Sequence, residues 1–297
     1  MFTLDAIIGI LFNGIFYGSI LFLIAAGLQL IFGVQRILNL ACGSFYALGV
    51  YTGVTFIEFF MGIGLPHIYF IIALIIAGLI LGFIGPIIER GILKPIYARE
   101  MEFQLLATFA LVLIFEDVIR FVWGIYPKIS KVSPVIYGEL RIGATILPIY
   151  YIFVIVISLT IALFMGFMIK KTKLGKTLRA ISDNREMSAA LGVNVNKFYL
   201  LSFTIGTIMG TIGGSLMAPV TAAWLGLGVE IIVYAFAVVV IGGLGSMIGA
   251  FIGAMIVGVF KGLAIAIYPE LEVLIIYAVV IAILIMKPSG LFGRIEE

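Results

Sequence analysis

Long apolar runs, each about as long as a membrane-spanning helix, recur from one end of the chain to the other. About 20 consecutive apolar residues suffice to cross the hydrocarbon core of a bilayer as a helix. Broken at charges and at Pro/Gly clusters, the runs predict spans near residues 6–33, 40–61, 67–88, 104–123, 147–169, 198–222, 230–245, 247–267 and 272–286. The run at 230–245 is short, so it either crosses or is re-entrant. The pattern predicts an all-α polytopic membrane protein with eight or nine transmembrane helices.

The composition agrees with this pattern and limits the chemistry. Hydrophobic residues make up 63% of the chain and charged residues 11%, and no polar segment is long enough for a separate soluble domain. Residues 1–297 are therefore expected to form a single transmembrane domain, with the first span retained rather than cleaved as a signal peptide. The lone Cys42 and the lone His67 exclude an internal disulfide and argue against a metal or haem site, so no cofactor is expected on this chain.

Basic residues are concentrated in a few loops, which predicts the orientation in the membrane. Seven of the eighteen Lys and Arg fall within residues 170–197. If that segment is cytoplasmic and there are nine spans, thirteen basic residues lie inside and three outside, as the positive-inside rule requires. The inside set is Arg36, Arg90, Lys94, Arg99, the seven of 170–197, Lys287 and Arg294, and the outside set is Lys128, Lys131 and Arg141. The N-terminus is then outside and the C-terminus cytoplasmic.

The outer loop 124–147 contains a strand-like alternation, VIYGELRI, at residues 135–142. A small hairpin on the outer face is expected there. It serves either as a solvated connector or as a docking surface for an external partner.

Glycines follow a four-residue spacing at Gly206, Gly210 and Gly214, and again at Gly245, Gly249 and Gly253. Such spacing places small residues on one helix face, where backbones pack closely in lipid. The stretch IGGLGS at 241–246 is different, because adjacent glycines favour an unwound segment. Its free N–H groups would suit the carboxylate of a zwitterionic substrate.

The charged and polar residues of the spans bear on the transport mechanism. Glu116 and Arg120, four residues apart near the outer end of one span, predict a local ion pair. No midspan carboxylate or histidine relay is evident, which disfavours a proton- or sodium-coupled carrier. The candidate residues of a substrate pathway are neutral: Asn39, Cys42, Ser44, Thr108, Gly242, Gly243 and Gly245.

The basic segment contains KLGKT at 173–177, which is only half of a phosphate-binding loop. The first glycine of that motif is replaced by Lys170, so the chain is not expected to bind ATP by itself. Residues 174–190 predict one amphipathic helix, with Thr172 capping its start and Gly192 ending it. Either its lysines hold lipid phosphates, or the helix docks into a groove of a cytoplasmic protein.

Several motifs resemble one family. EMSAALG at 186–192 resembles the EAA loop of ABC-importer permeases, which is their coupling helix. The longer LGKTLRAISDNREMSAALGVNVNK at 174–197 is similar to the form found in LivH-type permeases of branched-chain amino acid importers. Further similar stretches are GLQLIFGVQRILNLACGSFYALGVY at 27–51, LATFALVLIFEDVIRFVWG at 106–124 and VVVIGGLGSMIGAFIGAMIVG at 238–258. The resemblance covers nearly the whole chain. It departs at Cys42 and Ser44, where family members commonly carry His and Glu.

The resemblance implies an ABC-importer permease fold in the cytoplasmic (inner) membrane, surrounded by lipid, with no covalent chemistry and no nucleic acid partner. The implied partners are a second, homologous permease forming a heterodimer, two cytoplasmic ATP-binding subunits that hold ATP-Mg, and an extracytoplasmic binding protein that delivers leucine, isoleucine or valine. Residues 170–197 become the coupling loop, with contacts expected from Leu178, Arg179, Ile181, Asp183, Arg185, Glu186, Ala189, Ala190 and Gly192.

Other functions remain open at this point. The same family includes permeases for urea and other amides. A stand-alone secondary carrier or channel would use the Gly-rich broken span and the polar residues of the first two spans. A membrane-embedded enzyme is disfavoured, because neither a nucleophile–base pair nor a metal-ligand set is evident.

Overall fold

A computed structural model of the protein describes residues 4–143 and 145–293, except for the side chain of Ile142. Arg294, counted above among the cytoplasmic charges, lies outside the described residues. The helices and strands are α1 (Leu4–Gln35), α2 (Ala41–Gly62), α3 (Phe70–Gly82), α4 (Gly85–Ile88), α5 (Met101–Trp123), β1 (Glu139–Ile142), β2 (Thr145–Pro148), α6 (Ile149–Lys171), α7 (Lys173–Asp183), α8 (Arg185–Ala190), α9 (Val195–Met217), α10 (Leu227–Gly242), α11 (Met247–Ile267) and α12 (Glu272–Met286). Short 3-10 or π turns occupy His67–Tyr69, Glu89–Leu93, Lys94–Ile96, Pro134–Tyr137 and Pro269–Leu271.

Seven helical segments of the described chain are long and apolar enough to cross a membrane. They are Leu4–Gln35, Ala41–Gly62, His67–Ile96, Ile149–Lys171, Val195–Met217, Met247–Ile267 and Pro269–Met286. The two remaining predicted spans are also helical, but α5 carries four charged residues and α10 is only 16 residues long. A count of eight or nine spans therefore depends on α5 and α10.

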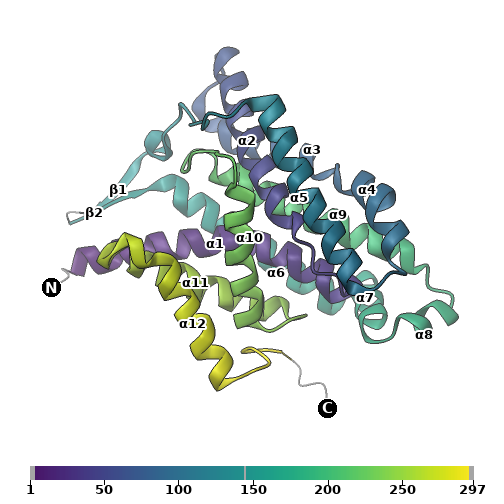
Figure 1. The fold of residues 1–297 in the computed structure, drawn as a ribbon. Helices are drawn as coiled ribbons and strands as arrows, with labels where there is room; N and C mark the ends of the chain where they lie inside the picture. The colour runs from purple at the N-terminus through teal and green to yellow at the C-terminus, as the bar shows by residue number, and fades with distance from the viewer. Residues whose placement is uncertain (1–3, 144, 294–297) are drawn as a thin grey trace.

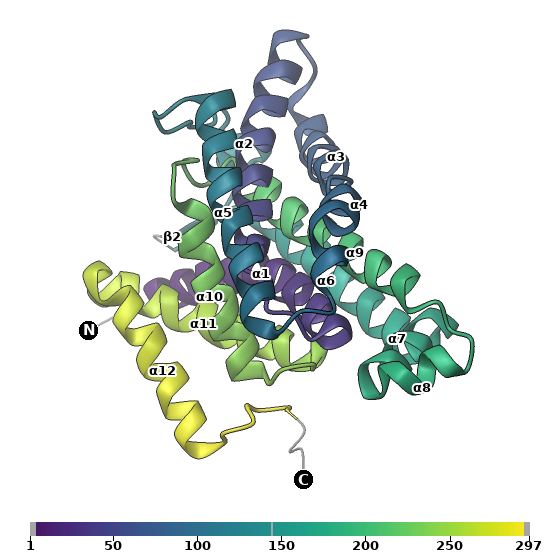
Figure 2. The same cartoon turned by 45° about the vertical axis from the view of Figure 1, so that its right-hand side comes forward.

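The third predicted span, 67–88, is not one straight helix. Its apolar stretch breaks after Gly82, resumes as α4 at Gly85 and continues as a π turn from Glu89. Pro86, which has no backbone N–H, is the second residue of α4 and accounts for the local change of path. Figure 2 shows α3 and α4 following one another along α9, which both contact.

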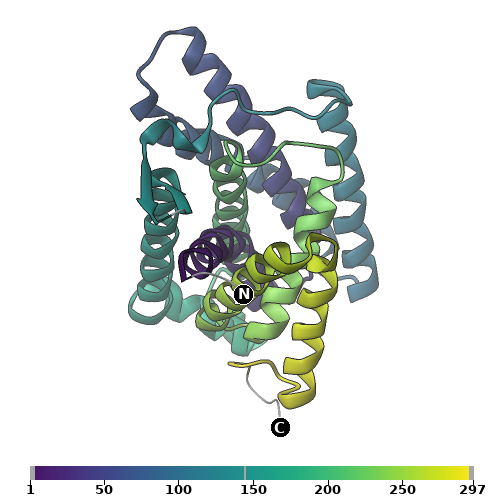
Figure 3. The ribbon, with the colours of Figure 1, turned by 90° about the vertical axis from the view of Figure 1, so that its left-hand side faces the viewer.

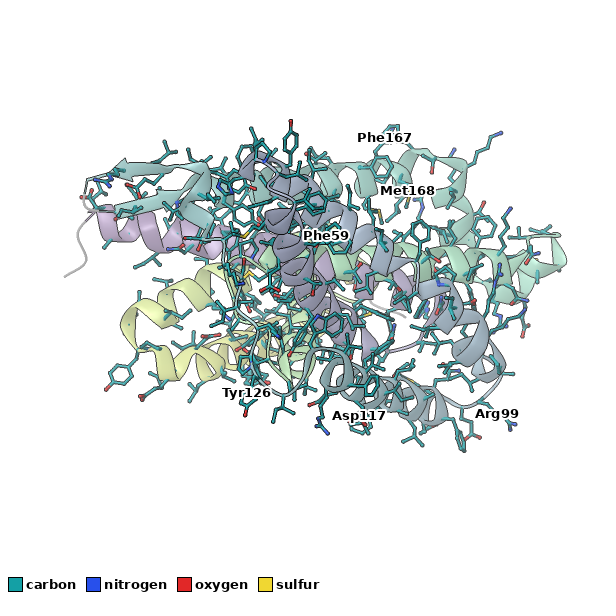
Figure 4. All side chains as sticks on the ribbon, turned by 90° about the horizontal axis from the view of Figure 1, so that it is seen from above. Phe59, Arg99, Asp117, Tyr126, Phe167 and Met168 are labelled. Atoms are coloured by element: carbon teal, nitrogen blue, oxygen red, sulfur yellow. The ribbon has the colours of Figure 1, made fainter. Side chains whose placement is uncertain are left out.

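Helix α1 lies at the centre of the molecule. It packs mainly against α11 and α9, and also against α6 and α10, and its side chains from Ser19 to Ile31 are buried throughout. In Figures 1 and 3 the other helices surround it, while α12 lies at the periphery with Ile276 as its one buried residue among those described. The apolar faces of the outer helices remain exposed, as expected for surfaces that meet lipid. Figure 4 shows this on α6, where Phe167 points away from the bundle and the adjacent Met168 is buried.

Glycines allow several helices to touch backbone to backbone, as the four-residue spacing predicts. A Cβ added to Gly27 of α1 would lie 2.5 Å from the carbonyl oxygen of Gly206 in α9. One added to Gly214 would overlap the Tyr46 carbonyl of α2, whereas one added to Gly210 would find no atom closer than 3.6 Å.

The second glycine set is confirmed in part. Gly249 and Gly253 of α11 abut the backbone of α10. Gly245 does not belong to this packing face, because it lies in the turn before α11, and a Cβ there would meet nothing within 4 Å.

The two ends of the molecule differ in content. At one end β1 and β2 form the predicted hairpin, pairing Leu140 with Leu147, while residues 134–137 form a 3-10 turn instead of extending the strand. The Thr145 hydroxyl there donates to the Asp5 carbonyl at 2.8 Å, joining the hairpin to the start of α1. At the opposite end, α7 meets the end of α1, where the Arg36 guanidinium donates to the Ser182 carbonyl at 3.3 Å, and α8 follows α7. Figure 1 shows the two ends on opposite sides of the view.

We predict that Gly214→Ala lowers the stability of the purified protein and that Gly210→Ala does not. The added methyl group at position 214 must displace the backbone of α2, and overpacking of this kind costs roughly 1–3 kcal/mol. The measurement is the melting temperature of each variant in detergent. Equal melting temperatures for the two variants would contradict the packing role of Gly214.

Candidate functional site

The segment between α6 and α9 folds as two helices, which corrects the prediction of a single helix over 174–190. Thr172 caps α7 as predicted, since its hydroxyl accepts a hydrogen bond from the Gly175 N–H at 3.1 Å. Asn184 then adopts an extended backbone and caps α8 by accepting from the Met187 N–H at 2.9 Å. Asparagine is a preferred N-cap residue, and this signal in the sequence was missed. Gly192 ends α8 with a φ of +85°, as predicted.

Burial divides the nine predicted coupling residues into two groups. Leu178 and Ile181 are 2% exposed and belong to the hydrophobic core, so they anchor α7 against α6 and α1. The other seven are exposed: Arg179, Asp183, Arg185, Glu186, Ala189, Ala190 and Gly192. A partner can therefore reach the second group, and the first group holds the surface in position.

Two apolar residues that sequence reasoning passed over complete this surface. Met187 is 58% exposed and Leu191 is 78% exposed. Met187 lies within α8 and Leu191 directly follows its last residue, with the small side chains of Ala189 and Ala190 between them in the sequence. We refer to Met187, Ala190 and Leu191 as the α8 tip. An exposed apolar tip on a charged segment is typical of a helix that docks into a partner's groove.

The α8 tip is also connected to the rest of the molecule. The Arg185 guanidinium lies 5.4 Å from the centre of the Tyr199 ring of α9, and Tyr199 in turn packs edge-on against Tyr97. The Gln35 amide at the end of α1 donates to the Tyr199 carbonyl at 2.8 Å. Because Tyr199 contacts all three groups, α8 is linked to α1 and α9.

The predicted pathway residues near the turn between α1 and α2 are buried in local contacts. The Asn39 side-chain oxygen accepts from the Ala41 N–H at 3.1 Å and starts α2. The Thr108 hydroxyl of α5 donates to the Leu38 carbonyl at 3.3 Å. Cys42, in the first turn of α2, is buried. Ser44 lines a small cavity of about 20 Å³ together with Glu116 and Trp224.

The three predicted glycines lie at the break between α10 and α11. Gly242 packs against Gly249, and the carbonyl of Gly243 accepts from the Gln29 amide at 2.7 Å. Gly245 is exposed in the turn. The structure thus distributes the seven predicted pathway residues over several places, and their role in a pathway remains a prediction.

The predicted ion pair between Glu116 and Arg120 is corrected. Arg120 pairs instead with Asp117, at 3.3 Å, and Glu116 turns to the small cavity. Both residues of the pair are largely exposed, so the pair contributes little to stability. Figure 4 shows Asp117 on the outer side of α5, between Arg99 and Tyr126 beyond the helix ends.

A larger cavity, which the sequence did not reveal, lies at the hairpin end. Its volume is about 370 Å³, and its walls come from α1, α2, α6, the connection between α9 and α10, and the neighbouring ends of α10, α11 and α12. Figure 3 views the molecule from this end. The lining residues include the charged Glu230, Lys261 and Glu272, the aromatic Phe16, Tyr17, Tyr46, Tyr151 and Trp224, and the polar Asn13 and Thr221. We call it the outer-end cavity, after the end of the molecule that the distribution of basic residues predicts to face outward.

Lys261 makes an ion pair and two aromatic contacts in the outer-end cavity. Its ammonium nitrogen lies 2.6 Å from a Glu272 carboxylate oxygen, and the two side chains are 12% and 20% exposed. The same nitrogen lies 3.7 Å from the centre of the Tyr17 ring and 4.7 Å from that of Tyr234. The Tyr234 hydroxyl donates to Glu272 at 3.0 Å. Lys261 falls inside the predicted span 247–267 and was counted in neither set of basic residues in the sequence analysis.

No cluster of three or more His, Cys, Asp or Glu in residues 4–143 and 145–293 could hold a metal ion. Outside the spans, burial raises the pKa of Tyr137, in the turn Pro134–Tyr137, to about 12, so this phenol stays neutral at physiological pH.

Comparisons with known proteins place these features in context. Residues 10–284 match the family described as "Branched-chain amino acid transport system / permease component". The high-affinity branched-chain amino acid transport system permease protein LivH of Salmonella typhimurium is 27% identical, over 96% of this chain and 95% of that protein. The corresponding BraD protein of Pseudomonas aeruginosa is 24% identical with the same coverage, and a probable LivH of Methanocaldococcus jannaschii is 28% identical over 96% and 92%.

One solved structure, PsaBC from Streptococcus pneumoniae in complex with Fab, aligns with 94% of this chain and 92% of that chain. The identity is 12% and the TM-score 0.49, which is too low to assign a common fold.

We predict that breaking the Lys261–Glu272 pair from one side destabilises the protein more than removing both charges. Lys261→Met or Glu272→Gln leaves one buried charge without its partner, and such losses cost roughly 3–5 kcal/mol, whereas the double variant leaves none. Melting temperatures of the two single variants and the double variant in detergent form the test. If the two single losses simply add in the double variant, the two charges do not stabilise each other.

Proposed function

The chain belongs to the family of branched-chain amino acid transport system permease components, and on this premise we propose that it is the membrane-spanning subunit of an ATP-driven importer for leucine, isoleucine and valine. It is a multi-pass protein of the cytoplasmic membrane and a transport permease, not an enzyme. In this proposal ATP-Mg is bound and hydrolysed by two cytoplasmic subunits, and a second, homologous permease completes the translocation unit as a heterodimer. An extracytoplasmic binding protein delivers the amino acid.

The exposed α8 tip is the main support for the coupling role. We place the α7–α8 end in the cytoplasm, because the basic segments meet there and positive charge accumulates on the cytoplasmic side. The N-terminus then lies outside and the C-terminus inside. The α8 tip, with Glu186 and Gly192 beside it, fits a groove of an ATP-binding subunit in the manner of a helix in a groove.

Movement of the α8 tip would reach the core of the molecule along two connections. The first runs through α7, whose buried Leu178 and Ile181 pack against α6 and α1. The second runs through Arg185 and Tyr199 to α9. Packed elements shift as units, so a displaced α8 would carry α1, α6 and α9 with it. ATP-driven closure of the cytoplasmic subunits would thereby change access to the outer end.

The outer-end cavity favours branched-chain amino acids over the alternative substrates. Phe16, Val220, Leu227 and Ile231 present an apolar wall to the cavity. A branched aliphatic side chain gains free energy by leaving water for such a wall. Urea and small amides have no apolar part that would use it.

We predict that Leu191→Glu reduces ATP-driven leucine uptake about tenfold or more and weakens co-purification of the ATP-binding subunits. Burying a leucine side chain contributes roughly 1.5–3 kcal/mol, and a charge in the groove removes that contribution. The assay is uptake by proteoliposomes that contain the assembled importer and the binding protein.

Leu191→Met is the matched control and should keep wild-type uptake, since methionine preserves the apolar volume. Both variants should insert and melt as the parent does, because Leu191 contributes little to the core at 78% exposure. Full uptake by Leu191→Glu would refute docking through the α8 tip. Substantial ion-gradient-driven flux by this chain alone would instead identify a stand-alone carrier.

A further inference from the structure

We propose that the outer-end cavity is a binding site for a free α-amino acid within the permease, and that Glu230 receives its ammonium group. This inference rests on the proposed function and adds to it a recognition site on this chain, with a stated chemistry.

The charges of the cavity favour a cationic group. Glu230, Lys261 and Glu272 give the lining a net charge of minus one at neutral pH. Lys261 already faces Glu272 and two aromatic rings, so its ammonium group is occupied. The Glu230 carboxylate, by contrast, makes no hydrogen bond or ion pair with the described residues, although its charge also acts on Lys261. Glu230 is exposed, so an incoming ammonium group can reach it, and the net negative lining attracts a cation.

The neutral lining groups suit the other end of a zwitterion. The Asn13 side-chain amide and the Thr221 hydroxyl line the same cavity, and neither side chain is hydrogen-bonded within the described chain. The amide N–H groups and the hydroxyl can each donate a hydrogen bond to a carboxylate. Neutral donors hold a carboxylate without adding a second buried positive charge, which Lys261 and the nearby membrane would make costly.

The remaining walls suit an apolar side chain and a cation together. Tyr17, Tyr46, Tyr151 and Trp224 contribute aromatic rings to the lining, and such rings bind an ammonium group on their faces. The volume of about 370 Å³ lies within the range of small-molecule sites. In this arrangement the Lys261–Glu272–Tyr234 cluster is a positioning group, which fixes the ends of α10, α11 and α12 around the site.

Cysteine labelling tests the proposal directly. Cys42 is the single cysteine of the chain, so Cys42→Ala with Val220→Cys places one thiol in the cavity wall. The protein used is the permease assembled with its ATP-binding subunits in lipid vesicles, without the binding protein. We expect positively charged aminoethyl methanethiosulfonate to react with this thiol at least about fivefold faster than the negatively charged sulfonatoethyl reagent, once each rate is divided by that reagent's rate with free cysteine, because the cavity is net negative.

Protection by ligands identifies the recognised group. Leucine is expected to slow the labelling, and 4-methylpentanoate, which lacks only the ammonium group, is expected not to. Glu230→Gln should raise the leucine concentration for half-protection about tenfold, equivalent to ~1.4 kcal/mol of binding free energy. Glu58→Gln is the matched control, since Glu58 is an exposed acid of α2 that does not line the cavity, and it should leave protection unchanged.

The possible failures are distinguishable. ATP-driven leucine uptake is measured in parallel on the same vesicles with the binding protein added. Uptake without protection of the Val220→Cys thiol would overturn the cavity site and leave the proposed function intact. Equal protection by 4-methylpentanoate would overturn ammonium recognition. The comparison of the two reagents on the parent thiol needs no change at Glu230, so it decides the charge argument even if Glu230→Gln does not fold.

Discussion

Close backbone contact along α1 is the constraint on which the rest of this structure depends. Lipid is as apolar as the side chains of a membrane helix, so helices gain little by hiding apolar surface from it and associate instead through close packing. Gly14 and Gly18 bring α1 against α11, and Gly27 brings it against Gly206 of α9. With α1 fixed between these two helices, the remaining spans are placed around it, and their outer faces are left for lipid and for partner subunits.

The same helix connects the two regions to which we assign functions. Its 32 residues extend about 48 Å at 1.5 Å per residue, which is more than the thickness of the hydrocarbon core. Asn13, Phe16 and Tyr17 lie in its first half and line the outer-end cavity. Its last residue, Gln35, donates to the Tyr199 carbonyl of α9, and the following Arg36, which takes a left-handed φ of 59°, donates to the Ser182 carbonyl of α7. A helix that touches both regions can transmit movement between them without a chain of flexible loops.

The sequence predicted the features that depend on local pattern and on family resemblance. It did not predict the features that depend on which distant residues meet in the folded chain. Apolar runs gave the helix positions within a few residues, and Thr172 and Gly192 were correctly placed as helix ends. The division at Asn184 was missed, because the periodicity of α7 and α8 runs on across it. Glu230, Lys261 and Glu272 come from three different helices, so nothing in their spacing indicates that they line one cavity. The α8 tip shows the same limit, since exposure cannot be read from residue type.

The pairing of Lys261 with Glu272 also bears on how the chain enters the membrane during synthesis. A lysine in the hydrocarbon region costs on the order of 2.5–3.5 kcal/mol on insertion scales, and this one lies in α11 with its carboxylate partner at the start of the next helix to be made. The connection between α11 and α12 is short, since only Tyr268 and the turn Pro269–Leu271 lie between them. If α11 and α12 insert together as one hairpin, Glu272 would neutralise Lys261 while Lys261 enters the membrane. In that case the peripheral α12, which buries little of its own surface, would serve chiefly to complete the insertion of α11.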